Sequence, residues 1–116
     1  MRKVYYLSTC DTCKRIMREL ALDDFEKQDI KTEPITLEQI KEMRELSGSY
    51  ESLFSKIARK YRSLGLKEKS LSEEDLKNYI LEEYTFLKRP VFIIDDEIYI
   101  GNSKKNIEAL NKIIGL

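Results

Sequence analysis

The only two cysteines of this chain, Cys10 and Cys13, lie in the segment STCDTCKRIM at residues 8–17. Two thiols at this spacing could bind a metal ion, form a structural disulfide or act as a reactive centre. A zinc site takes about four ligands, and because the chain has no histidine, these cysteines could complete one only as a Cys₄ site shared by two copies. A disulfide between them would close a loop too short to constrain the unfolded chain strongly. Two buried, unreactive thiols are a further alternative, since free cysteine packs well in apolar cores.

The elements around the cysteines favour the reactive alternative. Residues 3–7, KVYYL, predict a short buried strand, and from Thr12 onward the apolar residues follow a helical period. A C-x-x-C pair that opens a helix after a strand meets free backbone N–H groups and the positive end of the helix dipole, which stabilise a thiolate. Cys10, at or just before the cap, is therefore predicted to be the nucleophile. Cys13 is predicted to be the resolving thiol, which attacks a mixed disulfide formed at Cys10.

Other side chains next to the thiols bear on the same chemistry. Lys14 and Arg15 add positive charge, whereas the Asp11 carboxylate opposes ionisation of a neighbouring thiol. We expect the helix dipole to dominate over Asp11. Thr9 and Thr12 are candidate substrate-binding residues because their hydroxyls can donate hydrogen bonds, although a threonine beside a helix start is more often only a cap.

A second candidate site region is the dipeptide Arg89-Pro90, which precedes a predicted hairpin. A proline at this junction, in a sheet beside a C-x-x-C helix, predicts a cis peptide that faces the thiols. The alternative is a trans proline at the start of an edge strand. Arg89 would supply a fixed charge and a bidentate fork for an oxyanion or a glutathione carboxylate, and its alternative is a solvated arginine.

The remaining elements are predicted from periodicity and capping signals. A weak strand at Phe25–Ile30 is followed by three helices, and the chain closes with a hairpin and a last helix. The first of the three helices opens at Thr36 with a capping box and ends near Gly48. The others are predicted at Leu53–Leu64, with Leu53, Phe54, Ile57, Tyr61 and Leu64 inward, and at Ser72–Glu83. The hairpin pairs VFIID with EIYIG, and Ser103 caps the last helix.

This order predicts one α/β domain over residues 1–116, with a helical insert at about 36–84. Lysine plus arginine equals aspartate plus glutamate, 21 each, and the zero net charge does not support direct nucleic-acid binding. A basic run at residues 56–69 reads either as a nucleic-acid or polymerase-facing surface or, as we favour, as a solvated helix face. No signal peptide or membrane-length apolar run is found, so we expect a cytoplasmic protein without a membrane partner.

Three stretches together resemble the ArsC/Spx family, the arsenate reductase-like branch of the thioredoxin superfamily: YYLSTCDTCKRIMREL, YRSLGL and FLKRPVFIIDDEIYIGNSKKNIEAL. The resemblance covers essentially the whole chain. It implies a thioredoxin-like fold with a small four-stranded mixed sheet and an inserted helical subdomain. It also implies a cis proline at Pro90 and places the redox-active thiol at Cys10.

The chain departs from the arsenate reductases of that family at two anion-binding arginines. Ser55, with Lys56 beside it, stands near one of these positions, and Asn102 stands in the G-R-P-like stretch of the other. Only Arg89 has a clear counterpart, although Arg59 or Arg62 could substitute if the insert is shifted by a turn. A charge-assisted contact contributes about 1.5–3 kcal/mol, so efficient arsenate reduction is not expected.

The resemblance therefore predicts a thiol-disulfide oxidoreductase with no bound cofactor or metal. It would act as a monomer on a small thiol or oxyanion substrate, with glutathione, thioredoxin or glutaredoxin as the external reductant. The alternative is an Spx-like redox-switched regulator that binds the C-terminal domain of the RNA polymerase α subunit. Gly48 lies close to the glycine that Spx proteins use at that contact.

Overall fold

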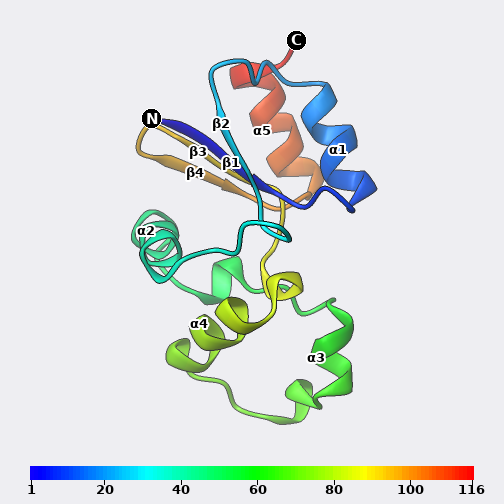
Figure 1. The fold of residues 1–116 in the computed structure, drawn as a ribbon, viewed down its shortest axis with the longest axis vertical. Helices are drawn as coiled ribbons and strands as arrows, with labels where there is room; N and C mark the ends of the chain where they lie inside the picture. Colours follow the sequence, from blue (N-terminus) through cyan, green and yellow to red (C-terminus); the bar gives the residue numbers. More distant parts are fainter. The chain divides into compact units, whose positions relative to one another are not determined.

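The computed structural model describes all residues from Met1 to Leu116. The chain divides into two compact units, one formed by Met1–Glu33 with Arg89–Leu116 and the other by Pro34–Lys88 (Figure 1). The first unit contains the sheet and both cysteines. The second contains the three helices that follow the second strand, where the sequence predicts an insert.

The sheet of the first unit has four strands in the order β2-β1-β3-β4. The strands are β1 (Arg2–Tyr6), β2 (Glu26–Asp29), β3 (Val91–Ile94) and β4 (Glu97–Ile100). β1 pairs in parallel with β2 and antiparallel with β3, and β3 pairs antiparallel with β4. The predicted mixed four-stranded sheet and α/β class are therefore confirmed. In the parallel pair, Tyr6 lies opposite Asp29, so the ends of β1 and β2 meet at one edge of the sheet.

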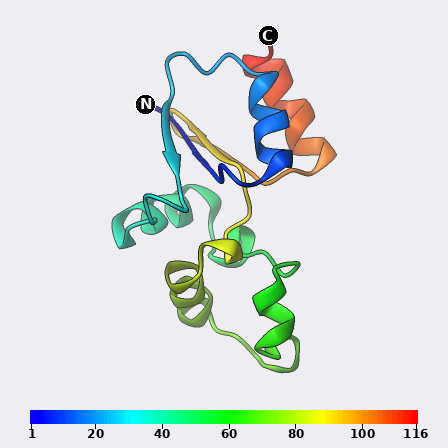
Figure 2. The same cartoon turned by 45° about the vertical axis from the view of Figure 1, so that its right-hand side comes forward.

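Two helices, α1 (Asp11–Arg18) and α5 (Lys104–Ile114), lie side by side on one face of this sheet (Figures 1 and 2). Their apolar residues pack against inward-facing side chains of β1 and β3. The buried members of this core are Val4, Ile16, Leu20, Leu22, Phe25, Phe92, Ile94, Leu110 and Ile114. The C-terminal ends of the helices are also tied through the backbone, because Ala21 N–H donates to the Ile114 carbonyl at 2.7 Å. The core and this tie fix the position of α1, whose first turn carries the cysteines.

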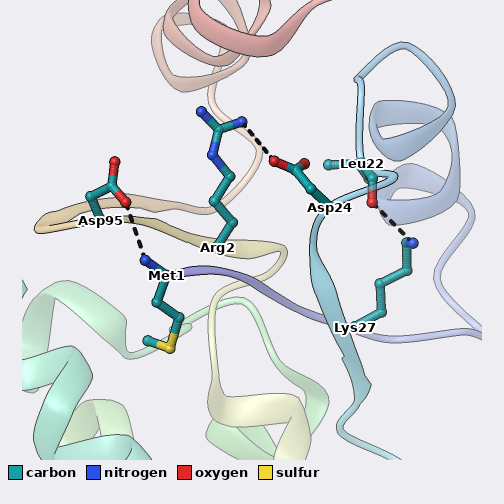
Figure 3. Close-up of polar contacts among 6 residues, drawn as sticks. All are labelled: Met1, Arg2, Leu22, Asp24, Lys27 and Asp95. Atoms are coloured by element: carbon teal, nitrogen blue, oxygen red, sulfur yellow. Dashed lines mark hydrogen bonds and ion pairs between the residues drawn. The ribbon is translucent and has the colours of Figure 1, made fainter.

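Exposed polar contacts pin the ends of the strands (Figure 3). The N-terminal ammonium of Met1 lies 3.1 Å from Asp95 in the hairpin turn, and Arg2 lies 3.5 Å from Asp24. The Lys27 ammonium donates to a backbone carbonyl of the loop between α1 and β2 at 3.1 Å. Surface ion pairs contribute about 0–1 kcal/mol each. The apolar core therefore supplies most of the stability of this unit.

The second unit is built from α2 (Leu37–Ser47), α3 (Arg59–Ser63) and α4 (Glu73–Glu82). Two short 3₁₀ helices, η1 (Glu51–Leu53) and η2 (Leu66–Glu68), lie between them, and a third, η3 (Tyr84–Phe86), follows α4. Its core is aromatic. Phe54 stacks on Phe86 with ring centroids 5.0 Å apart, and Tyr61 and Tyr79 each pack edge-on against one of these rings. Such ring pairs add about 0.5–1.5 kcal/mol beyond their buried area.

The predicted continuous helix at Leu53–Leu64 is wrong. Phe54 is extended and forms a β-bridge with Leu87, and Ser55 N–H donates to the Phe86 carbonyl at 2.7 Å. The helix therefore starts only at Arg59, and the supposedly inward Ile57 is 89% exposed. Leu64, also predicted inward, is 46% exposed. The pairing of Phe54 with Leu87, far along the chain, prevents the helix that the apolar spacing predicts. The free energy gained by burying Phe54 exceeds the cost of exposing Ile57.

The helix starts that capping signals predicted are confirmed. Capping boxes open α2 at Thr36 and α4 at Ser72, and Ser103 caps α5. Gly48 ends α2 in the left-handed conformation at φ 93°, which glycine adopts without strain. The hairpin turns at Asp95 and Asp96, as predicted. None of the helices combines the length and the apolar composition that crossing a bilayer requires.

Candidate redox site

The turn between β1 and α1 places Cys10 at the start of the helix. Cys10 N–H donates to the Leu7 carbonyl at 3.0 Å, and the Cys10 carbonyl accepts the first helical hydrogen bond, from Lys14, at 3.2 Å. Cys10 is the N-cap residue, with extended backbone angles of φ −98° and ψ 110°. The predicted position at the helix cap is therefore confirmed. Its thiol forms no side-chain cap hydrogen bond.

The surroundings of Cys10 favour the thiolate. Partial burial raises the pKa of the Cys10 thiol, but the nearby Cys13 backbone N–H and Cys13 thiol lower it, because both favour the thiolate. The positive charge of Arg89 and the Thr12 N–H lower it further, and the net pKa lies below the ordinary value of a cysteine. Cys10 remains partly exposed, so a substrate can reach its sulfur.

Cys13 differs from Cys10 in nearly every respect. It is fully buried on the inner face of α1, and burial raises the pKa of its thiol to about 12. The Leu7 N–H and Arg89 act against this rise, whereas the neighbouring Cys10 sulfur adds to it. Both cysteines are free thiols in the structure. The pair thus has one sulfur that ionises first and one that stays protonated and donates to it.

Arg89 and Pro90 lie at the start of β3 in the same unit as the cysteines. The Arg89–Pro90 peptide is cis, as predicted, and Pro90 is buried. The Pro90 carbonyl accepts a hydrogen bond from Gly101 N–H at 2.8 Å, which ties this junction to the end of β4. Arg89 is close enough to both thiols to favour their ionisation. The structure therefore brings three of the predicted site residues together: Cys10, Cys13 and Arg89.

The two threonines lie on either side of the helix start. Thr9 is exposed in the turn, and Thr12 is partly exposed in the first turn of α1. Their role in substrate binding remains a prediction. Nearby, the Lys14 Nζ lies 3.7 Å from the Asp11 Oδ1 in an exposed ion pair. Each of these charges therefore offsets the other beside the start of α1.

One residue that the sequence analysis overlooked contacts the same turn. The Asp29 carboxylate, at the end of β2, accepts hydrogen bonds from Ser8 N–H at 3.3 Å and from Lys31 N–H at 3.1 Å. The available signal was its position, since an acidic residue stands next to the last residue of the weak strand predicted at Phe25–Ile30. Without the register of the two strands, that signal could not be interpreted.

Of the residues discussed at or near the positions of the missing anion-binding arginines, Asn102 belongs to the first unit and Ser55, Lys56, Arg59 and Arg62 belong to the second. Ser55 is buried, whereas Lys56, Arg59 and Arg62 are exposed. Substitution of a missing arginine by Arg59 or Arg62 remains a prediction. No group of three or more cysteine, aspartate or glutamate side chains is arranged to hold a metal ion.

The second unit has an open pocket of about 240 Å³ beside the C-terminal half of α2. It is lined by Lys41, Arg44, Glu45, Tyr50 and Glu73. The Glu73 carboxylate accepts the backbone N–H groups of Tyr50 at 2.7 Å and of Glu51 at 3.2 Å, which fixes the chain just after Gly48. The pocket therefore carries charged side chains of both signs, and one of them, Glu73, is held by two backbone hydrogen bonds.

Comparisons with known proteins match the chain over most of its length. The sequence model of the ArsC family matches residues 5–110. The global transcriptional regulator Spx of Lactiplantibacillus plantarum is 24% identical over 107 residues, which cover 90% of this chain and 81% of that protein.

Solved structures give the same result. A possible arsenate reductase from Streptococcus mutans superposes with a TM-score of 0.73 at 30% identity, over 96% of this chain and 98% of that one. An arsenate reductase from Vibrio cholerae superposes with a TM-score of 0.71 at 17% identity, over 97% of this chain and 96% of that one. At that identity the second match supports the fold alone, and the fold it supports is the thioredoxin-like one.

Proposed function

Because the chain belongs to the ArsC family, we propose that it is a cytoplasmic thiol-disulfide oxidoreductase with Cys10 as nucleophile and Cys13 as resolving thiol. The observation that carries the proposal is the asymmetry of the pair. Cys10 is partly exposed with a lowered thiol pKa, and Cys13 is buried with a thiol pKa of about 12. An exposed thiolate with a protonated neighbour suits a two-step exchange.

In the first step, the Cys10 thiolate attacks one sulfur of a substrate disulfide. A bond forms between Cys10 and that sulfur, the substrate S–S bond breaks, and the second substrate sulfur leaves as a thiolate that takes a proton from water. Arg89 and the N–H groups at the start of α1 stabilise negative charge at this position. Thr9, Thr12 and Pro90 are proposed to border the substrate.

In the second step, Cys13 loses its proton and attacks the Cys10 sulfur. The Cys10–Cys13 disulfide forms, and the remaining substrate thiol is released. The negative charge on Cys10 raises the pKa of Cys13 in the free protein. Because a mixed disulfide removes that charge, the pKa of Cys13 falls when its attack is needed. The two protein thiols supply two electrons, which an external reductant, either glutathione or thioredoxin or glutaredoxin, restores.

We propose a glutathione mixed disulfide as the substrate rather than arsenate. Arg89 is the one arginine among the residues that act on both thiols, which suits a single carboxylate of glutathione. An arsenate oxyanion carries several oxygens that need charge-assisted donors, and the arginines expected for them are replaced at Ser55 and Asn102. Each such donor is worth about 1.5–3 kcal/mol.

A side-by-side assay tests the proposal. The reduced protein is given either a glutathione mixed disulfide of a small thiol or arsenate, with an excess of external reductant, and the thiol state is read by mass spectrometry. Turnover of the mixed disulfide, with glutathione on Cys10 and then a Cys10–Cys13 disulfide, supports the proposal. Preferential turnover of arsenate contradicts the substrate, and no reaction with either compound contradicts the enzyme.

A second candidate function is a redox-switched regulator that binds the C-terminal domain of the RNA polymerase α subunit. The match to the Spx regulator supports it, as does the pocket beside Gly48, with exposed Lys41 at its edge. Capture of that domain should depend on the redox state and fail in a Lys41→Glu variant. Lys105→Glu, an equally exposed reversal on α5, is the matched control. Absence of capture in both redox states would remove this candidate.

A further inference from the structure

The turn that carries Cys10 is held from outside by one carboxylate. Asp29 ends β2, and its Oδ1 accepts Ser8 N–H at 3.3 Å and Lys31 N–H at 3.1 Å. The Ser8 hydroxyl also hydrogen-bonds to this carboxylate. Ser8 lies two residues before Cys10, so the carboxylate fixes the turn from both the backbone and the side chain of one residue.

Ser8, which Asp29 holds, is adjacent in the chain to Leu7, and Leu7 contacts the cap residue. Leu7, next to Ser8, accepts the Cys10 N–H through its carbonyl at 3.0 Å. The Leu7 N–H also lies close enough to the Cys13 sulfur to lower the pKa of that thiol. A shift of the Leu7–Cys10 turn would therefore change the backbone angles of the cap residue and the distance of its sulfur from the N–H groups of α1.

The strand register explains why Asp29 can reach this turn. β1 and β2 run in parallel with Tyr6 opposite Asp29, and Ile30 N–H donates to the Tyr6 carbonyl at 2.9 Å. The carboxylate thus leaves β2 at the level where β1 ends and the turn begins. A backbone turn after the strand, in which Glu33 N–H donates to the Asp29 carbonyl at 2.8 Å, fixes the residue itself.

We propose that Asp29 is a positioning residue for the thiol pair, whose carboxylate holds the Ser8–Cys10 turn so that the Cys10 sulfur faces the N–H groups of α1. The inference rests on the proposed function and deepens it. Asp29 touches neither sulfur in the structure and acts through Ser8 and Leu7.

The direction in which the Cys10 thiolate population changes when Asp29 is replaced distinguishes a positioning role from a direct effect of the Asp29 charge. A nearby negative charge raises the pKa of a thiol, so removing the Asp29 charge alone would leave the Cys10 thiolate unchanged or more populated. Loss of the turn instead moves the sulfur from its hydrogen-bond donors and makes the thiolate less populated. The other charged groups around the pair, Arg89, Asp11 and Lys14, stay the same in every variant.

The experiment measures alkylation of Cys10 by iodoacetamide against pH, with the site assigned by peptide mass spectrometry. Asp29→Ala should react about tenfold more slowly near pH 6.5, because the rate follows the thiolate fraction. Asp29→Asn keeps an acceptor oxygen for Ser8 and should react within about twofold of the unchanged protein. Asp75→Ala is the matched control, since Asp75 also accepts a backbone N–H, that of Ser72 at 2.9 Å, but in the second unit.

The outcomes separate the inference from the proposed function. If unchanged Cys10 reacts no faster than Cys13 below pH 8, the proposed function fails and the inference with it. If unchanged Cys10 reacts readily but Asp29→Ala is as fast, or Asp29→Asn is as slow as Asp29→Ala, the inference alone is overturned.

A measurement on the unchanged protein covers the case in which Asp29→Ala does not fold. The amide proton shifts of Ser8 and Lys31 should titrate together with the Asp29 carboxyl, in the acid range below the usual aspartate pKa. A Ser8 amide that does not respond to this titration overturns the inference.

Discussion

The N-terminus of α1 differs from those of the other long helices. α2, α4 and α5 begin at Thr36, Ser72 and Ser103, and in each the hydroxyl accepts a backbone N–H from the first turn. α1 begins at Cys10, whose thiol forms no such bond. A hydroxyl cap contributes about 0.5–2 kcal/mol to helix stability. The start of α1 therefore lacks the stabilisation of a hydroxyl cap, and its N–H groups are next to the Cys10 thiol instead.

α1 can lack this cap because it is held elsewhere. Ile16 and Leu20 pack in the core under the sheet, and Ala21 N–H ties the helix end to the last turn of α5. α5 shares this core and this tie, and it also has a hydroxyl cap, as α2 and α4 do. In α1, packing and the backbone tie near the C-terminal end stabilise the helix, whereas the N-terminal end carries the thiols. Substitutions can test this separation.

The largest effect is expected for Cys10→Ser. The hydroxyl stays protonated at neutral pH, so turnover of a disulfide substrate should fall by about 10⁴-fold or more. The same change places a good capping residue at the start of α1, so the free energy of unfolding should rise by up to about 1 kcal/mol. Enzyme assay and urea unfolding measure the two effects. A variant that is both inactive and less stable would contradict the idea that Cys10 replaces a cap.

The next effect concerns Cys13→Ser. The first exchange step needs only Cys10, so one equivalent of substrate should still react, and the mixed disulfide at Cys10 should then accumulate. Multiple turnover supported by the internal disulfide should stop. Mass spectrometry of the intact protein detects the added substrate half. Full turnover without a trapped adduct would show that an external thiol resolves the intermediate.

The sequence predicted the parts of the fold that depend on local signals. Capping residues marked the starts of α2, α4 and α5, and Asp95 marked the hairpin, because each signal lies within four residues of the feature it determines. The region after Leu53 was mispredicted because the β-bridge of Phe54 pairs it with a residue far along the chain. The apolar spacing there fitted a helix, but the pairing decided the outcome.

The same distinction applies to the site. Cys10 and Cys13 could be assigned to a helix start from a local motif, and the cis peptide before Pro90 from its place before the hairpin. Asp29 could not be assigned, because its contact with Ser8 spans 21 residues and depends on the register of two strands. Sequence analysis thus located the candidate reactive groups better than the side chain that contacts their turn.

A smaller effect is expected for Thr36→Ala, which removes the hydroxyl cap of α2 in the second unit. Thr36 and Gln39 form reciprocal hydrogen bonds of 3.1 Å. Their loss should reduce the free energy of unfolding by about 1 kcal/mol in urea denaturation. The alkylation rate of Cys10 should stay unchanged, since α2 belongs to the other unit. Thr36→Ser keeps the hydroxyl and serves as the control, and a changed thiol rate in Thr36→Ala would couple the two units.

The smallest effect is a pH dependence at the start of α4. The Asp75 carboxylate accepts the Ser72 N–H at 2.9 Å, and this bond, together with that of the Ser72 side chain, holds the pKa of Asp75 below its usual value. A carboxyl whose pKa is lower in the folded than in the unfolded state binds fewer protons when folded. Its stabilisation is therefore complete above the ordinary aspartate pKa and disappears as the pH falls through the lowered folded value. Asp75→Asn should be less stable than the unchanged protein at neutral pH, and this difference should close in acid. Urea unfolding at a series of pH values measures it. An equal difference at all pH values would mean that packing at this position, rather than the charged cap, stabilises α4.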